Sequence, residues 1–194
     1  VLPEELHSSL LITFSEKRNP NKKQEGAGDM AMTTFAAIDI GSYEVSMKIF
    51  ELSKKIGFHQ LSDVRYRLEI GKGAYSSGRL EPEIVDSVCD ILNDFARIMK
   101  EFGVSDYRAC ATSAFREMIN PLIVKEQIYR RTGIDVEILS NAEQHFLGYK
   151  SIAAKESGFK KMIQKGTAIL DVGGGGLQVS LFDKDALVTT QSLK

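Results

Sequence analysis

The sequence has few cysteines, almost no net charge and no long apolar run. Its 194 residues include two cysteines, Cys89 and Cys110, which are isolated and lack CxxC spacing. This spacing suggests neither a disulfide framework nor a zinc site and predicts two buried core thiols. Because 25 Lys and Arg residues nearly balance 26 Asp and Glu residues, no overall field draws the chain to nucleic acid or to an anionic membrane.

No apolar run approaches the roughly 20 residues that span a bilayer. The N-terminus also lacks the basic, apolar and small-residue order of a signal peptide. These absences predict a cytoplasmic protein without nucleic-acid or membrane partners. Any polyanionic ligand must therefore be bound by a local site.

The first part of the chain has the composition of a linker. The stretch "NPNKKQEGAG" lies before the first strand-like run and is polar, charged and rich in glycine and asparagine. We therefore expect residues 1–32 to be a flexible N-terminal extension outside the core.

The hydrophobic pattern of the rest alternates between strand and helix periods, which indicates an α/β fold. Strands are expected at 35–39, 44–51, within 58–70, at 107–111 and 135–139, as a hairpin over 167–182, and at 187–192. Helices are expected at 84–102, at 121–132, and after Ser140 and Glu143, which have capping-box spacing. The segment 71–80, "GKGAYSSGRL", is expected to be a loop.

Two stretches about 130 residues apart follow one plan. "AAIDIGSYEVSMKIF" (36–50) and "AILDVGGGGLQVSLF" (168–182) each contain a strand, an Asp, an apolar residue, a Gly turn and a second strand. Glycines bring backbone N–H groups close to phosphate oxygens, and an Asp at a strand end can hold a cation. The repeat predicts that the loops after Asp39 and Asp171 face a common cleft and clamp a phosphate chain.

Four segments carry a family resemblance in order and spacing: "GKGAYSSGRLEPE" (71–83), "ATSAFREMIN" (111–120), "ILSNAEQ" (138–144) and "LDVGGGG" (170–176). Together they resemble the exopolyphosphatase and guanosine pentaphosphate phosphohydrolase family, within the sugar kinase, Hsp70 and actin superfamily. The resemblance implies an α/β fold with an actin-like ATPase (ribonuclease H-like) domain I at 33–160. It also implies that 161–194 is the first hairpin of a similar domain II, so that the chain is expected to be a truncated fragment.

The resemblance implies a phosphoanhydride hydrolase that releases terminal phosphate from polyphosphate or guanosine pentaphosphate (pppGpp) with Mg²⁺. A homodimer is one possible assembly, and the sequence leaves the oligomeric state open. Asp39 and Asp171 would then be the metal ligands. By position, the phosphate-binding residues would be Gly41, Ser42, Arg116, Gly173, Gly174 and Gly175.

Three positions depart from the family pattern. Gln144 stands where the family has the second Glu of a pair, which serves there as the base, and Gln178 stands where the second loop has Glu. Tyr43 replaces an Asn in the first loop. Since a Gln cannot accept a proton at neutral pH, losing a base costs roughly 10²- to 10⁴-fold in rate. Glu143 is the alternative base if the alignment shifts by one residue.

Three functions remain open at this point. The first is an exopolyphosphatase-type hydrolase impaired at its two Gln positions. The second is a catalytically degenerate regulator that binds polyphosphate or a guanosine alarmone. The third, an actin-like or sugar-kinase-like ATPase, is disfavoured by the segments 71–83 and 111–120.

Overall fold

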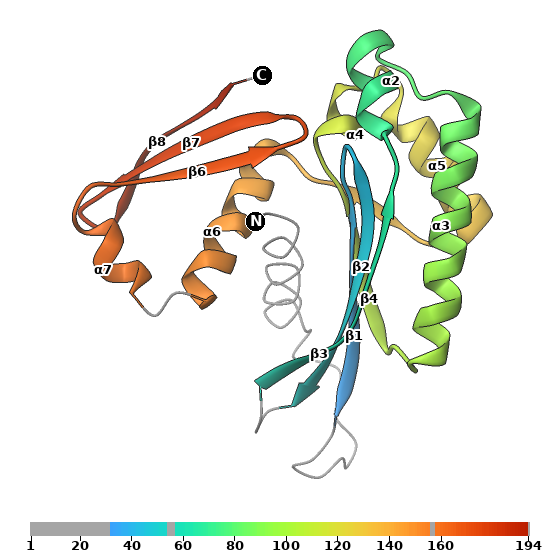
Figure 1. Cartoon of the computed structure of the whole chain (residues 1–194), viewed down its shortest axis with the longest axis horizontal. Helices are drawn as coiled ribbons and strands as arrows, with labels where there is room; N and C mark the ends of the chain where they lie inside the picture. The colour runs from blue at the N-terminus through green and yellow to red at the C-terminus, as the bar shows by residue number, and fades with distance from the viewer. Residues whose placement is uncertain (1–31, 54–56, 156–157, 194) are drawn as a thin grey trace.

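A computed structural model describes residues 32–53, 57–155 and 158–193. Nearly all of the predicted extension, residues 1–32, lies outside these ranges. The described chain forms two lobes, one around a five-stranded sheet and one around a three-stranded sheet (Figure 1).

The sheet of the first lobe is mixed. Its strands are β1 (Thr33–Ile40), β2 (Glu44–Ser53), β3 (Gly57–Arg67), β4 (Asp106–Ala111) and β5 (Val136–Ile138), in the order β3-β2-β1-β4-β5. β1 pairs antiparallel with β2 and parallel with β4, which in turn pairs parallel with β5. The carboxyl ends of the three parallel strands therefore meet at one edge of the sheet, and β1 enters the first glycine loop there.

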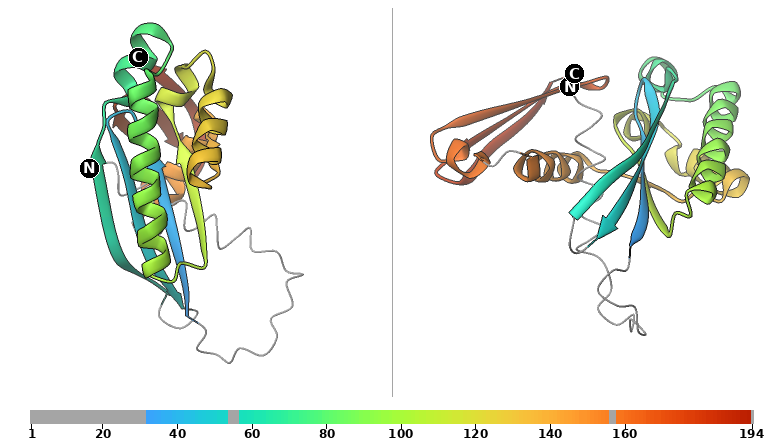
Figure 2. Two further views of the ribbon diagram at one scale, coloured as in Figure 1. Left: turned by 90° about the vertical axis from the view of Figure 1, so that its right-hand side faces the viewer. Right: turned by 60° about the horizontal axis from the view of Figure 1, so that its bottom comes forward.

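The helices are α2 (Ile70–Ser77), α3 (Pro82–Glu101), α4 (Ser113–Glu117), α5 (Pro121–Thr132), α6 (Asn141–Lys155) and α7 (Phe159–Ile163). α3 and α5 cover one face of the five-stranded sheet (Figure 2). α6 lies on the opposite side of this sheet, between the two lobes (Figure 1).

The main core lies between the sheet and the long helix α3. Val45, Met47 and Ile49 alternate along β2 and are fully buried there, as the period-two pattern predicts. Ser46 and Lys48 between them are buried too, so β2 is covered on both faces rather than half-buried. α3 buries a stripe that includes Leu92 and Phe95. Its boundaries also follow the sequence signals, because Pro82 lies in its first turn and Gly103, just past its end, has φ of +60°.

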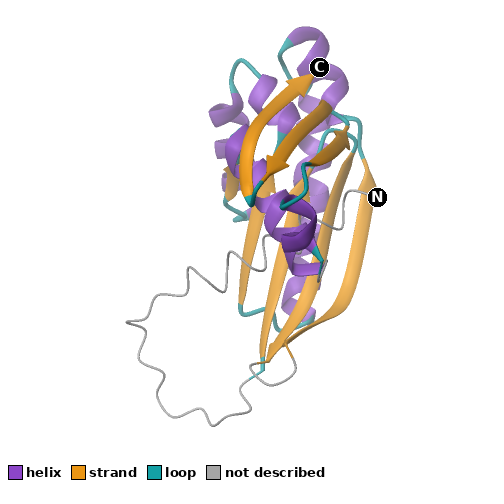
Figure 3. Ribbon diagram, turned by 90° about the vertical axis from the view of Figure 1, so that its left-hand side faces the viewer, coloured by secondary structure: helices purple, strands orange, loops and turns teal. Residues whose placement is uncertain are grey.

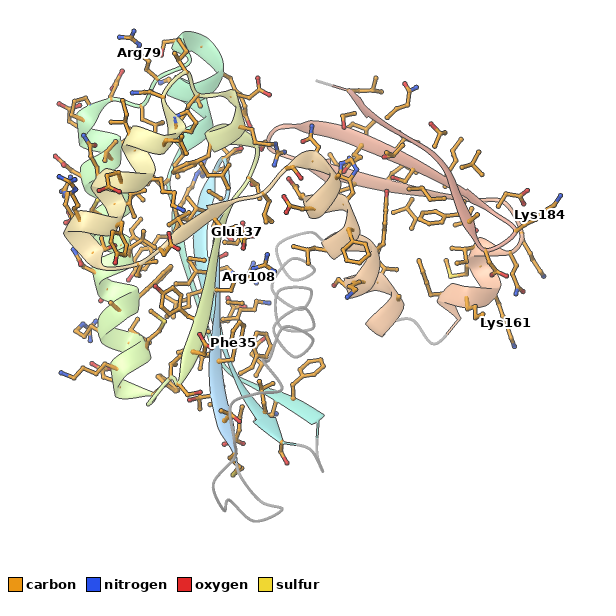
Figure 4. All side chains as sticks on the ribbon, turned by 180° about the vertical axis from the view of Figure 1, so that it is seen from behind. Phe35, Arg79, Arg108, Glu137, Lys161 and Lys184 are labelled. Atoms are coloured by element: carbon orange, nitrogen blue, oxygen red, sulfur yellow. The ribbon has the colours of Figure 1, made fainter. Side chains whose placement is uncertain are left out.

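Both cysteines are buried, as predicted. Cys89 lies on α3 and faces the main core, and Cys110 lies in a second cluster on the other face of the sheet. Phe35 and Leu147 belong to that second cluster, so α6 packs against the first lobe. Figure 4 shows Phe35, Arg108 and Glu137 on this same face of the sheet.

The second lobe contains β6 (Thr167–Gly173), β7 (Gly176–Asp183) and β8 (Ala186–Leu193) as an antiparallel meander (Figure 3). α6 packs against this sheet too, since the ring centroids of Tyr149 and Phe182 are 5.1 Å apart. α6 thus connects the lobes. Leu170, Val172 and Val188 are 60%, 60% and 64% exposed, so this sheet leaves apolar side chains uncovered.

The loop predicted for 71–80 is wrong, because residues 70–77 form α2. Glycine and serine disfavour a helix by propensity, but tertiary contacts override this here. The N–H group of Gly71 donates to the carbonyl of Ser42 at 2.7 Å, and a Cβ at Gly71 would lie 3.0 Å from Ser42 Cβ. The glycine therefore lets α2 lie directly against the first glycine loop, and Gly78, with φ of +70°, ends the helix.

Two five-residue helices, α4 and α7, are absent from the sequence prediction. Neither is long enough to show a helical period. In the part of the chain that the structure describes, no helix has the length and apolar character needed to cross a membrane.

Candidate active site

A cavity of about 530 Å³ lies between the two glycine loops. It is lined from the first lobe by the turn after β1 and by α4, from the second lobe by the turn between β6 and β7, and from between the lobes by the start of α6. Both Asp39 and Asp171 line it, so the two loops face one cleft as their repeated plan predicts.

The first loop is a tight turn. The N–H group of Gly41 donates to the carbonyl of Glu44 at 2.9 Å, and a Cβ at Gly41 would lie 3.1 Å from that same oxygen. Gly41, Ser42, Tyr43 and Glu44 all line the cavity. The two strands that hold the turn, β1 and β2, are paired from Thr33 to Ile40, so this edge of the cavity is rigidly supported.

The second loop approaches the first lobe closely. Gly173 pairs with Gly176 across the hairpin, which leaves Gly174 and Gly175 at the tip. A Cβ at Gly174 would lie 2.4 Å from the ring of Tyr43, and one at Gly175 would lie 2.4 Å from Ser113 Oγ. Since real Cβ atoms do not approach so closely, these two positions require glycine for the lobes to meet as they do.

Three hydroxyl groups converge where the loops meet. Ser42 Oγ lies 2.6 Å from Tyr75 Oη and 3.0 Å from Ser113 Oγ, and Tyr75 donates to Ser113 at 3.0 Å. Ser42 comes from the first loop, Tyr75 from α2 and Ser113 from the start of α4. Hydroxyl groups can both donate and accept, so this cluster can turn donors toward phosphate oxygens.

Arg116 lies on α4, one turn after Ser113, and lines the cavity. Its Nη1 donates to the carbonyl of Leu139 at 2.8 Å, at the end of β5. Burial is the main effect on its pKa and lowers it. A half-buried guanidinium held by one backbone carbonyl keeps other N–H groups for an anion, and its planar fork suits phosphate.

The carboxylate of Asp39 is electrostatically unfavourable in the ligand-free protein. Its Oδ1 is buried without a hydrogen-bond partner among the described residues, and so is Oε1 of Glu44. Burial, followed by the charge of Glu44, raises the pKa of Asp39 to about 7. Burial also raises the pKa of Asp171. Glu44 Oε1 lies 3.9 Å from Nη1 of Arg65, whereas the buried Oδ1 of Asp39, unpartnered among the described residues, favours a positive charge nearby.

These residues fit a magnesium ion better than a metal bound wholly by protein. Among the described residues, no group of three or more His, Cys, Asp and Glu side chains is arranged to hold a metal. Mg²⁺ keeps several waters and needs only one or two carboxylates together with substrate phosphates. Asp39 and Asp171 can supply these carboxylates, and Glu44 is a third acidic group that sequence reasoning did not single out.

Metal-free protein should lose stability as pH rises from about 4 to about 7, because the native state then binds more protons than the unfolded chain does. The raised pKa of Asp39 is the main cause, with Asp171 acting in the same direction. Asp39→Asn should flatten this dependence. Urea unfolding in a chelating buffer at several pH values measures it, and an unchanged slope in the variant would contradict the assignment.

The two glutamines that depart from the family pattern both line the cavity. Gln144 lies in the first turn of α6, and its Oε1 is buried without a hydrogen-bond partner among the described residues. Gln178 lies opposite Asp171 on the neighbouring strand and donates to Ser192 Oγ at 3.4 Å. Each side chain is therefore placed where a carboxylate would reach the cleft.

Glu143 is engaged in helix capping. Its carboxylate accepts from the N–H group of Ser140 at 2.9 Å and from Ser140 Oγ at 2.7 Å, while its own N–H group donates to that hydroxyl at 3.2 Å. This is the capping box predicted from the sequence. The geometry gives Glu143 a structural role at the start of α6.

Sequence reasoning missed several residues of the site. Tyr75 lies in the segment predicted as a loop, and Ser113 begins a helix too short to be recognised. His145 also lines the cavity; the sequence shows it beside Gln144, but a lone His at a helix start is more often exposed or capping, so the sequence alone does not predict it to be catalytic. For Ser113, its place directly after a strand end was the one usable clue.

The fold and the two facing Asp-and-glycine loops define an α/β domain of the actin-like ATPase type. Residues 49–194 match the Ppx/GppA phosphatase family, and the chain belongs to that family.

Similar proteins agree with this assignment. The chain is 25% identical to exopolyphosphatase 2 of Mycobacterium tuberculosis, over 82% of this chain and 51% of that protein. It is 22% identical to the guanosine-5'-triphosphate,3'-diphosphate pyrophosphatase of Vibrio atlanticus, over 82% of this chain and 31% of that protein. The crystal structure of the Aquifex aeolicus Ppx/GppA family member superposes with a TM-score of 0.68 at 23% identity, covering 84% of this chain and 51% of that one. The chain thus spans about half or less of the length of these relatives.

Proposed function

We propose that this chain forms part of a phosphoanhydride hydrolase of the exopolyphosphatase type. Its substrate would be polyphosphate or pppGpp, from which it releases the terminal phosphate. The observation that carries the proposal is the meeting of two glycine loops, the carboxylates of Asp39 and Asp171, and Arg116 around one cavity. Two similar proteins, one named exopolyphosphatase 2 and one named guanosine-5'-triphosphate,3'-diphosphate pyrophosphatase, support the proposal further.

Binding of the phosphate chain falls to groups from both lobes. Backbone N–H groups of the two loops and the guanidinium of Arg116 are donors for phosphate oxygens. The hydroxyl groups of Ser42 and Ser113 lie beside them. Because these groups come from separate lobes, the substrate is held only where the lobes meet.

Asp39 and Asp171 would hold Mg²⁺. Glu44, which lines the same cavity, would add a negative charge near the ion. When bound, the ion supplies positive charge that neutralises phosphate oxygens. The same charge would relieve the carboxylates whose pKa values are raised by burial.

The site has amides, rather than proton-accepting carboxylates, at positions 144 and 178. A carboxylate at position 144 or 178 could accept a proton from the attacking water, whereas an amide can only orient it. We therefore propose that the protein hydrolyses its substrate slowly.

Phosphate release from polyphosphate, pppGpp and ATP, measured in parallel on the full-length protein, tests the proposal. Slow release from polyphosphate or pppGpp, dependent on Mg²⁺, is expected, with less from ATP. Binding of polyphosphate with no release at all would favour a regulator over a hydrolase. Faster release from ATP than from the other two would favour a general ATPase.

Glu143→Gln separates capping from catalysis. Glutamine also completes a capping box, so the variant should fold normally. Its turnover should stay close to that of the unchanged protein, because Glu143 acts in the capping box and Gln preserves that cap. A fall of roughly 10²-fold or more would instead identify Glu143 as the base.

A further inference from the structure

The cavity contains an imidazole that the family pattern does not assign. His145 follows Gln144 on α6, is partly buried and lines the cavity. A neutral imidazole can accept a proton at physiological pH, which neither Gln144 nor Gln178 can do. The site therefore holds a proton acceptor beside the position where the usual carboxylate is missing.

A chain of hydroxyl groups leads from Tyr149 to the imidazole ring. Tyr149 Oη is hydrogen-bonded to Ser180 Oγ, which lies 3.0 Å from Thr190 Oγ1. Thr190 Oγ1 in turn makes a long contact of 3.5 Å with His145 Nδ1. These contacts lead from Tyr149 on α6 through β7 and β8 and return to His145 on α6. Nδ1 is therefore contacted from the second lobe. Nε2 has no hydrogen-bond partner among the described residues.

The surroundings favour the neutral ring. Burial, and secondly the positive charge of Arg116, lower the pKa of His145. Tyr149 on the same helix is the ring neighbour, at 6.5 Å between centroids. The other titratable side chains that line the cavity are Asp39, Tyr43, Glu44, Glu117 and Asp171.

We propose that His145 Nε2 accepts the proton of the attacking water, an inference that rests on the proposed function. The water oxygen forms a bond to the terminal phosphorus while one of its protons passes to Nε2. The bridging P–O bond breaks, and its electron pair leaves with the oxygen of the shortened chain. The imidazolium then returns its proton to solvent.

The position of His145 also gives a reason for the slow turnover that the proposed function includes. Consecutive residues of an α-helix point about 100° apart, so His145 does not occupy the place of the carboxylate it replaces. Gln144, whose Oε1 has no partner among the described residues, can accept one hydrogen bond from the water while His145 takes the other proton.

The test uses His145→Asn in the full-length protein, with phosphate release from tripolyphosphate as the readout. Turnover should fall by roughly 10²-fold or more, whereas the Kd for tripolyphosphate should change less than about threefold, because a base acts mainly in the transition state. His59→Asn, the same change at an exposed position on β3, is the matched control and should leave both unchanged. Thr190→Val removes the contact to Nδ1 and should lower turnover without altering binding.

Gln144→Glu in the His145→Asn background should restore turnover, since it supplies a different base. The acidic limb of the pH profile in the unchanged protein should reflect a group titrating below about 6.5, and that limb should be lost in His145→Asn. Turnover that survives His145→Asn unchanged would overturn the inference while leaving the proposed hydrolase intact. Absence of phosphate release from both the unchanged protein and Gln144→Glu would overturn the hydrolase itself, and the inference with it.

Discussion

Gln144→Glu combined with Gln178→Glu is expected to raise turnover of polyphosphate by at most roughly 10²- to 10⁴-fold, the usual worth of a general base, and by less to the extent that His145 already accepts the proton. Both side chains already line the cavity, so the change adds carboxylates without requiring a new arrangement. The Kd of the phosphate chain should change little in the presence of Mg²⁺, because the base contributes mainly in the transition state.

Gln178→Glu should also make turnover more dependent on Mg²⁺. Gln178 lies directly opposite Asp171 on the neighbouring strand, so a Glu there places two carboxylates side by side. Like charges at such a pair repel each other unless a cation lies between them. The double variant should therefore lose more activity on chelation than the unchanged protein does.

Tyr43 provides the control for this prediction. Its side chain is 49% exposed and packs against Gly174 at the meeting point of the loops. If the ring obstructs the attacking water, adding Tyr43→Asn to the double variant should give the full increase in turnover. No increase in either the double or the triple variant would contradict the assignment of positions 144 and 178 to proton transfer.

Gly175→Ala is expected to weaken binding of the phosphate chain by roughly 10- to 100-fold, corresponding to an overpacking cost of about 1–3 kcal/mol. The new Cβ would lie 2.4 Å from Ser113 Oγ, 2.5 Å from Ser113 Cβ and 2.9 Å from Tyr75 Oη. Ser113 Oγ can rotate away, but Ser113 Cβ is fixed to the backbone, so the loop must withdraw from the first lobe. Isothermal titration with tripolyphosphate and Mg²⁺ measures the loss.

Gly173→Ala is the matched control within the same loop. A Cβ at Gly173 would meet no protein atom within 4 Å, so this variant leaves the meeting of the lobes undisturbed and should weaken tripolyphosphate binding much less than Gly175→Ala does. Equal effects of the two substitutions would show that loop flexibility, rather than close approach of the lobes, governs binding.

The framework of the fold could be predicted because its signals are local. Period-two patterning along β2 and the buried stripe of α3 arise from which faces are buried, and Pro82 and Gly103 mark the ends of the helix through backbone geometry. The Asp39 and Asp171 loops were found because their plan repeats. Each of these signals can be read within a few residues of the feature it predicts.

What could not be predicted depends on contacts between distant segments. α2 forms despite its glycines because Gly71 lies against Ser42, nearly thirty residues earlier. The hydroxyl cluster joins Ser42, Tyr75 and Ser113, which share no spacing pattern. His145 gains its significance from Thr190 on β8, and no local sequence signal connects these two residues.

The most direct test of the account is the rate of phosphate release from saturating polyphosphate, measured on a full-length sample whose binding of the same polymer has been established. The account predicts Mg²⁺-dependent binding together with a rate above that of buffer but below about 1 per second, the lower end of typical enzyme turnover. A rate within the ordinary range, on the order of 1 to 10³ per second, would mean that the site contains an efficient base and would contradict the account.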